Sequence, residues 1–179
     1  YPEITECFIF MENTGSPAIS IFDGGNPLIT KNIIIGGEYC NYGINVAYNV
    51  KTIIIKNNVV SGFIFNNISP SDVTESALIE NNNSLHLPEN IFGWAGIEGD
   101  PNTVIRNNIT AYSNVGIRGW STPVTNNNLF WQNINNTIGG VSLDSSDIVA
   151  DPMFVNDTIP VYGGTYDYHL QKYSPAIDA

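Results

Sequence analysis

The segment TVIRNNIT, residues 103–110, is a short apolar stretch that ends in a pair of asparagines. Three other segments share this pattern: TIIIKNNVV (52–60), ALIENNNSL (77–85) and PVTNNNLFW (123–131). Alignment on the second asparagine, extended to ITKNII (29–34), gives one column, which we term the asparagine ladder: Asn32, Asn58, Asn82, Asn108 and Asn128. Its members recur every 20–26 residues, and a repeat of this length indicates a solenoid.

The apolar residues keep the same register as the ladder. Isoleucine stands three residues before the ladder position in five consecutive repeats: Ile4, Ile29, Ile55, Ile79 and Ile105. The first of these repeats places Cys7 at the top of the ladder column. Gly, Pro and Asn interrupt every window that is long enough for a helix, so each repeat must consist of short strands and tight corners.

The sequence therefore predicts an all-β fold, a right-handed parallel β-helix of about six to seven rungs with roughly 20–26 residues each. Parallel strands of successive rungs lie about 4.8 Å apart, which stacks like residues on one another. Asparagine suits the corners because it tolerates the left-handed backbone region. Its side-chain amide can also bond the amides above and below, which gives the ladder a structural rather than a catalytic role.

Size and charge limit the remaining possibilities. The 179 residues are 42% hydrophobic and 13% charged, which fits one folded domain and excludes a disordered tail. No apolar run approaches the roughly 18 residues of a membrane span. The net charge of −11 argues against nucleic acid and against unaided binding of acidic polysaccharides. Calcium could bridge carboxylates to an acidic glycan, so it is the one cofactor that the sequence leaves open.

The two cysteines and the first residues give weaker indications. The spacing of Cys7 and Cys40 matches no metal motif, and a disulfide between them stays open but is not favoured, because Cys7 falls in the ladder column. The opening YPEITECFIF has neither an initiator methionine nor a signal peptide. We therefore expect the chain to be a fragment of a longer polypeptide with flanking domains.

The segment ADPMFVND…YDYHLQKYSPAIDA, from residue 150 to residue 179, carries a more specific pattern. Its DPxF, YHL and SPAIDA elements resemble the closing segment of secreted bacterial right-handed parallel β-helix repeat proteins, which belong to the pectate-lyase-like superfamily in architecture. The resemblance implies one β-helix domain over 1–179, closed by 150–179, and an extracellular or cell-surface location. It implies little about activity, because this scaffold hosts lyases, hydrolases, epimerases, adhesins and inert spacers.

Three charged residues are the candidates for catalysis. Glu98 and Asp100 are two residues apart, so on a strand they would face the same side about 7 Å from each other. Glycoside hydrolysis needs two carboxyl groups roughly 5–9.5 Å apart. Arg118 could neutralise charge in a lyase. The simpler interpretation, which we favour, is a structural salt bridge between Glu98 and Arg118. A turn that begins at Asp100 would then move this carboxylate out of the geometry that catalysis with Glu98 requires.

Aromatic residues near the predicted corners are the better candidates for ligand binding: Trp94, Trp120, Tyr112 and Tyr48. Their flat faces can stack on sugar rings without any charge, but large aromatics also cap corners and fill cores. Exposure of Trp94 and Trp120 on one face would favour binding, whereas burial of both would favour a stalk. No metal-binding motif is identified.

Three functions remain open. The first is an exported or cell-surface module that recognises polysaccharide without catalysis in this segment. The second is a polysaccharide lyase or another carbohydrate-active enzyme, such as a glycoside hydrolase. The third is a structural stalk or adhesin segment.

One apolar column does not fit simple alternation. It lies four residues before the ladder and consists of Leu28, Ile54, Leu78, Val104 and Val124. Strict alternation would place these side chains outside the solenoid. We favour a bend that turns them inward, with a covering loop or a partner as the alternatives.

Overall fold

The computed structural model describes residues 2–12, 15–37, 39–71, 73–86, 94–156 and 166–177. These residues form strands, turns and bends, so the all-β prediction is confirmed. Three parallel sheets, A, B and C, make up a solenoid, and a separate antiparallel hairpin follows it. No helix long and apolar enough to cross a membrane occurs in these ranges.

The three sheets are built from strands that recur in the same order along the chain. Sheet A contains β1 (Glu3–Thr5), β4 (Leu28–Thr30), β7 (Val50–Lys56), β10 (Val73–Glu80), β13 (Thr103–Arg106) and β16 (Val124–Asn126). Sheet B contains β2 (Phe8–Met11), β5 (Ile33–Gly36), β8 (Val59–Ser61), β11 (Asn83–Leu85), β14 (Ile109–Ala111), β17 (Leu129–Trp131) and β19 (Ile148–Val149). Sheet C contains β3 (Ile19–Phe22), β6 (Tyr42–Ala47), β9 (Asn66–Pro70), β12 (Ala95–Gly99), β15 (Val115–Gly119) and β18 (Asn135–Gly139).

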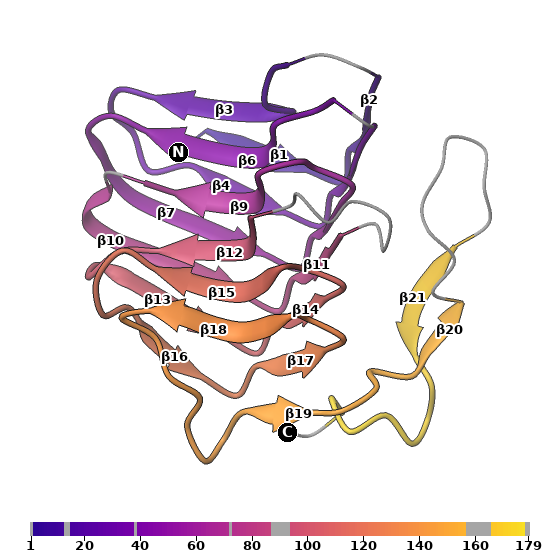
Figure 1. Cartoon of the computed structure of the whole chain (residues 1–179). Coiled ribbons are helices and arrows are strands. Elements are labelled where there is room, and N and C mark those ends of the chain that lie inside the picture. Colours follow the sequence, from indigo (N-terminus) through magenta and orange to yellow (C-terminus); the bar gives the residue numbers. More distant parts are fainter. Residues whose placement is uncertain are drawn as a thin grey trace.

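The chain passes from sheet A to sheet B to sheet C and then starts the next rung. In Figure 1 the strands of sheet C run from right to left across the front, and each rung lies below the one before it. This path gives a right-handed solenoid, the hand that parallel crossovers strongly prefer. The chain completes about five turns, slightly fewer than the six to seven rungs predicted.

The predicted register of the core is confirmed in sheet A. Ile29 pairs with Ile4 and with Ile55, and Ile79 continues the column to Ile105. The last four of these side chains have no solvent exposure. Because an apolar core contributes free energy in proportion to the buried area, this continuous isoleucine column is a main source of stability.

The asparagine ladder joins the same rungs at the corner between sheets A and B. The backbone N–H and the Nδ2 of Asn58 both donate to Oδ1 of Asn82, each at 3.0 Å. Nδ2 of Asn58 also donates to the carbonyl of Ile29, at 3.0 Å. Asn82 makes the equivalent bonds to Asn108. All five ladder residues are buried, and their amides satisfy one another.

The corner divides its two tasks between two residues. The position before each ladder residue has the positive φ, and it is occupied in succession by Lys31, Asn57, Asn81, Asn107 and Asn127. The ladder asparagines themselves are absent from the positive-φ residues of the described chain. The first asparagine of each pair therefore makes the turn, and the second makes the hydrogen bonds between rungs. Our prediction that the second asparagine does both is wrong.

The ladder has different residues at its two ends. At the upper end, the backbone N–H of Cys7 donates to Oδ1 of Asn32 at 3.0 Å, as its place in the column predicts. At the lower end, Oδ1 of Asp147 accepts from the backbone N–H of Asn128 at 2.9 Å. Asp147 was not recognised from the sequence. Both cysteines are free thiols, Cys7 exposed and Cys40 buried.

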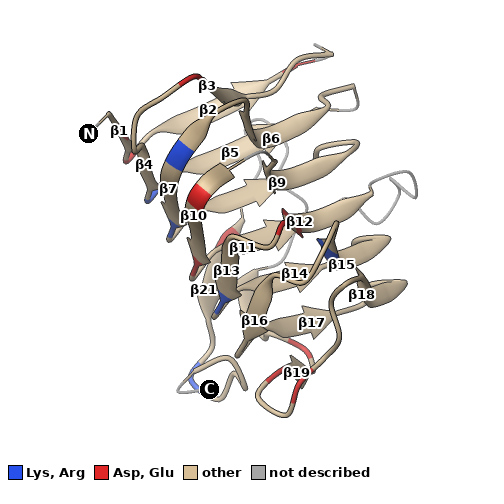
Figure 2. Ribbon diagram, turned by 90° about the vertical axis from the view of Figure 1, so that its left-hand side faces the viewer, with Lys and Arg blue, Asp and Glu red and all other residues tan. Residues whose placement is uncertain are grey.

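The apolar column of sheet A lies on the outside, so the predicted bend is wrong. Ile54 is 40% exposed between the buried Ile53 and Ile55, and Val124 is 54% exposed. Regular alternation therefore continues through these strands. A polar column lies beside this apolar one and includes the register partners Lys56, Glu80 and Arg106; charged residues along sheet A are visible in Figure 2.

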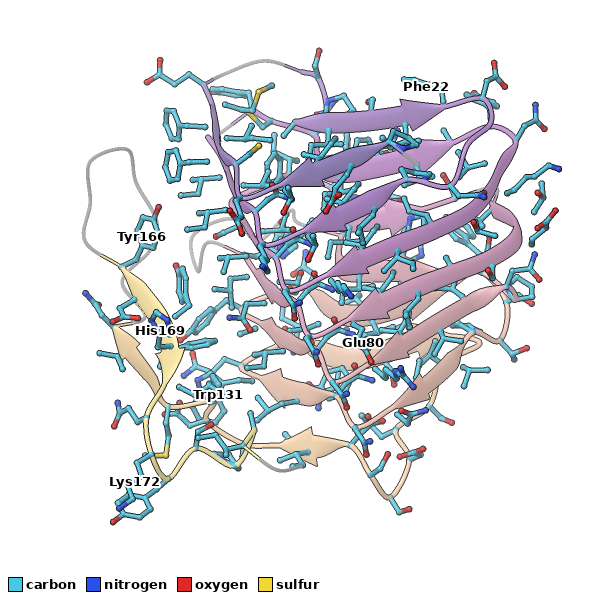
Figure 3. All side chains as sticks on the ribbon, turned by 180° about the vertical axis from the view of Figure 1, so that it is seen from behind. Phe22, Glu80, Trp131, Tyr166, His169 and Lys172 are labelled. Atoms are coloured by element: carbon cyan, nitrogen blue, oxygen red, sulfur yellow. The ribbon has the colours of Figure 1, made fainter. Side chains whose placement is uncertain are left out.

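The closing segment forms a cover over part of sheet B. Strands β20 (Phe154–Asn156) and β21 (Asp167–Leu170) pair in an antiparallel hairpin that stands beside the solenoid in Figure 1. Phe154 and Leu170 belong to an apolar cluster with Leu85 and Leu129 of sheet B. In Figure 3, Trp131 lies between the solenoid and the hairpin that carries His169. The lower half of the outer face of sheet B is thereby shielded from water.

Candidate functional site

The outer face of sheet C brings together two of the predicted charged residues. Glu98 of β12 and Arg118 of β15 are direct register partners, and Figure 2 shows the acidic and the basic residue of these two strands side by side. Arg118 Nη1 lies 3.6 Å from Glu98 Oε1. The other carboxylate oxygen, Oε2, accepts a hydrogen bond of 2.8 Å from Ser69 Oγ on β9. The favoured salt bridge is confirmed, and together with the bond from Ser69 it engages both oxygens of Glu98, which is only 7% exposed.

Two tryptophans lie against the same arginine. The guanidinium carbon of Arg118 is 3.9 Å from the ring centroid of Trp120 and 5.0 Å from that of Trp94. Trp120 follows the end of β15, and Trp94 directly precedes β12, so the two rings come from opposite ends of neighbouring strands. Trp94 is 53% exposed and Trp120 is 65% exposed. We term these three residues the Trp–Arg–Trp surface.

Further contacts fix the position of Trp94. Its backbone N–H donates to the carbonyl of Phe65 at 2.8 Å, and its ring meets the Phe65 ring edge-to-face with centroids 6.3 Å apart. Phe65 in turn contacts Tyr42, at 5.5 Å between centroids. Burial raises the pKa of the Tyr42 phenol, and the negative charge of Glu98 raises it further. The aromatic contacts therefore run from the exposed Trp94 through Phe65 to the half-buried Tyr42.

Asp100 does not join Glu98. It lies beyond the end of β12, and its Oδ1 accepts from Thr103 Oγ1 at 2.9 Å and from the backbone N–H of Asn102 at 3.1 Å. These bonds close the turn that begins at Asp100. Both oxygens of Glu98 and one oxygen of Asp100 are therefore engaged by groups of the protein itself.

The two candidate tyrosines lie elsewhere. Tyr48 is exposed at the corner after β6 and stacks on Phe22, with ring centroids 6.4 Å apart. That position is three strands along sheet C from β15. Tyr112 follows β14 and packs against the apolar cluster beneath the closing segment. The Trp–Arg–Trp surface therefore contains two of the four predicted aromatic residues.

A buried polar cluster lies inside the solenoid, near the corner between sheets B and C. His86 is 2% exposed, and its Nδ1 is 2.8 Å from Ser113 Oγ and 3.5 Å from Asn67 Nδ2. Nε2 of His86 has no hydrogen-bond partner among the described residues. Desolvation lowers the pKa of His86 to about 4, partly offset by the backbone carbonyls of Phe65 and Phe63. This imidazole is neutral at pH 7 and out of reach of a polymeric substrate.

The pKa of His86 predicts a specific loss of stability in mild acid. The folded value of about 4 lies below the ordinary 6.5, so between these values the unfolded chain binds more protons. The free energy of unfolding should therefore fall by about 3 kcal/mol as the pH drops from 6.5 to 4, and level off below that. Urea unfolding at a series of pH values measures it. The variant His86→Gln should lack this part of the pH dependence; identical slopes for both proteins would contradict the prediction.

Comparison with models of protein families, with curated proteins and with solved structures found no match. Within the described ranges, no group of three or more His, Cys, Asp or Glu side chains could hold a metal ion. The geometry on sheet C is therefore the main guide to function. This face carries two exposed indoles beside an arginine whose charge is offset by Glu98.

Proposed function

We propose that this chain is a non-catalytic carbohydrate-recognition module of an exported or cell-surface protein, and that it binds neutral polysaccharide on the Trp–Arg–Trp surface. The observation that carries the proposal is the exposure of Trp94 and Trp120 on one face, each against the same guanidinium. Exposed apolar surface that is grouped in one place is typical of an interaction site. Flanking domains of the same polypeptide belong to this proposal.

The rigidity of the two indoles supports binding. A tryptophan has only two side-chain torsions, and here Arg118 packs against both rings while Phe65 supports one of them. A surface that is already ordered loses little conformational entropy when a ligand arrives. The apolar faces of sugar rings can stack on such a surface, with their hydroxyl groups directed to water.

Charge favours a neutral glycan. Glu98 offsets the charge of Arg118 within the sheet, so the surface has no free cation to hold a uronate. The chain as a whole carries −11, and its field repels anionic polymers. Calcium would be required to bridge an acidic glycan to this protein.

Native electrophoresis through gels with embedded polysaccharides tests the proposal, with calcium and with chelator. We expect at least one neutral polysaccharide to retard the protein without clearing of the gel. The double variant W94A/W120A should weaken the apparent affinity at least about tenfold, because tryptophans that become buried on binding contribute much of the energy of an interface. The matched control is Tyr48→Asn, which removes an exposed aromatic from another part of sheet C and tolerates the positive φ there.

Two outcomes would overturn the proposal. If no polysaccharide shifts the protein, or if W94A/W120A migrates like the parent, the stalk or adhesin function takes precedence. If the gel is cleared, the chain is an enzyme, and a lyase with Arg118 as the neutralising group becomes the leading alternative.

A further inference from the structure

A cavity lies at the corner between sheets A and B. It has a volume of about 310 Å³ and is partly open to solvent. Asn81, Asn107 and Asn127, which precede the last three ladder positions, are among the residues that line it. Leu129 lines it from sheet B and Leu170 from the closing segment. We term this cavity the asparagine pocket.

The amides of the asparagine pocket are not used by the fold. Among the described residues, the side chains of Asn81, Asn107 and Asn127 have no hydrogen-bond partner; only their backbone N–H groups are bonded within the corner. Each carboxamide supplies two donors and one acceptor. Asn81 and Asn107 are exposed and Asn127 is half-buried, and because successive rungs repeat about every 4.8 Å, these three amides recur along the corner at that spacing.

Apolar residues share the lining of the pocket with these asparagines and with Asn83, Asn108 and Asn128. Ile109, Leu129 and Ile148 of sheet B line it together with Leu170 and Ala176 of the closing segment. The lining residues described here include no charged side chain. Neutral donors and acceptors beside an apolar surface suit a ligand with hydroxyl groups on an apolar ring frame. The volume is at the lower end of the range for ligand sites, so one ring fits and a long chain does not.

We infer that the asparagine pocket is a second binding site, which takes a single neutral sugar residue. It shares no residue with the Trp–Arg–Trp surface and lies at a different corner of the rung, away from the outer face of sheet C. The inference therefore goes beyond the proposed function and does not depend on it. With both sites occupied, one chain would hold two glycans on separate faces.

The test uses the full chain labelled with ¹⁵N and a panel of neutral methyl hexosides and pentosides. Titration should shift the side-chain NH₂ signals of Asn81, Asn107 and Asn127, and should saturate with a Kd on the order of 1 mM. Asn107→Gly, which keeps the positive φ, should raise that Kd at least about fivefold. Asn57→Gly is the matched control, because Asn57 has the same corner conformation one rung above the pocket and does not line it.

Each result decides for or against the pocket. Saturable shifts that Asn107→Gly weakens, and that W94A/W120A leaves unchanged, support it whether or not polysaccharide binds on sheet C. Shifts that do not saturate, that ignore Asn107→Gly, or that disappear in W94A/W120A would overturn it. The same holds if no glycoside in the panel shifts these amides.

Discussion

Replacement of Asn108 by leucine should lower the free energy of unfolding by about 3–5 kcal/mol. Oδ1 of Asn108 accepts from the backbone N–H of Asn82 at 2.9 Å and from its Nδ2 at 3.0 Å. Nδ2 of Asn108 donates to the carbonyl of Ile79 at 3.0 Å. A leucine removes all of these partners from buried groups that water cannot reach, so the melting temperature should fall by roughly 10 °C.

The neighbouring residue provides the control for this substitution. Asn107 occupies the same corner, but its side chain is exposed and makes no hydrogen bond within the described chain. Asn107→Gly should change the free energy of unfolding by less than about 0.5 kcal/mol, since glycine adopts the same positive φ. Calorimetry of the two variants separates the contribution of the ladder hydrogen bonds to stability from that of the corner conformation. A melting temperature of Asn108→Leu equal to that of Asn107→Gly would show that the ladder contributes nothing.

Replacement of Arg118 by methionine should destabilise the chain by about 2–4 kcal/mol. Methionine keeps an unbranched apolar stem against the two indoles but leaves Glu98 buried without its counter-charge. Most of the cost should come from that stranded carboxylate, which retains only the hydrogen bond from Ser69. Chemical denaturation of the variant measures the loss.

A double-mutant cycle identifies the source of the loss. Glu98→Gln removes the charge and can still accept the bond from Ser69, so E98Q/R118M should recover at least about 1 kcal/mol relative to R118M alone. Additive effects of the two substitutions would mean that the pair is not coupled. Should additivity coincide with lost polysaccharide binding in R118M, Arg118 would be a ligand-binding residue rather than a structural partner.

The regular part of the fold could be predicted because the solenoid repeats in sequence and in space. The isoleucine column and the ladder column both pair as the alignment requires. The apolar column of Ile54 was misjudged because hydrophobicity alone favours burial, whereas the neighbouring Ile53 and Ile55 already occupy the core. Alternation was the stronger rule there.

The candidate site was only partly predictable. The column position of Glu98 and Arg118 indicated their salt bridge, and the register confirms it. The convergence of Trp94 and Trp120 on Arg118 was not predicted, because both tryptophans lie just outside their strands and they belong to different rungs. The asparagine pocket was missed because Leu170 comes from a segment that does not repeat. The asparagines that precede four of the five ladder residues were the available signal.

The asparagine ladder has a direction. The backbone N–H of each ladder residue donates to the side-chain oxygen of the following rung, so these bond dipoles add along the solenoid axis. The row ends at Asp147, whose other oxygen accepts from the N–H of Asp144 at 3.1 Å. A carboxylate has no side-chain hydrogen to donate when it is ionised. Asp147 therefore ends the row of hydrogen-bonded side-chain amides. Its carboxylate places a negative charge at the end toward which the N–H groups point.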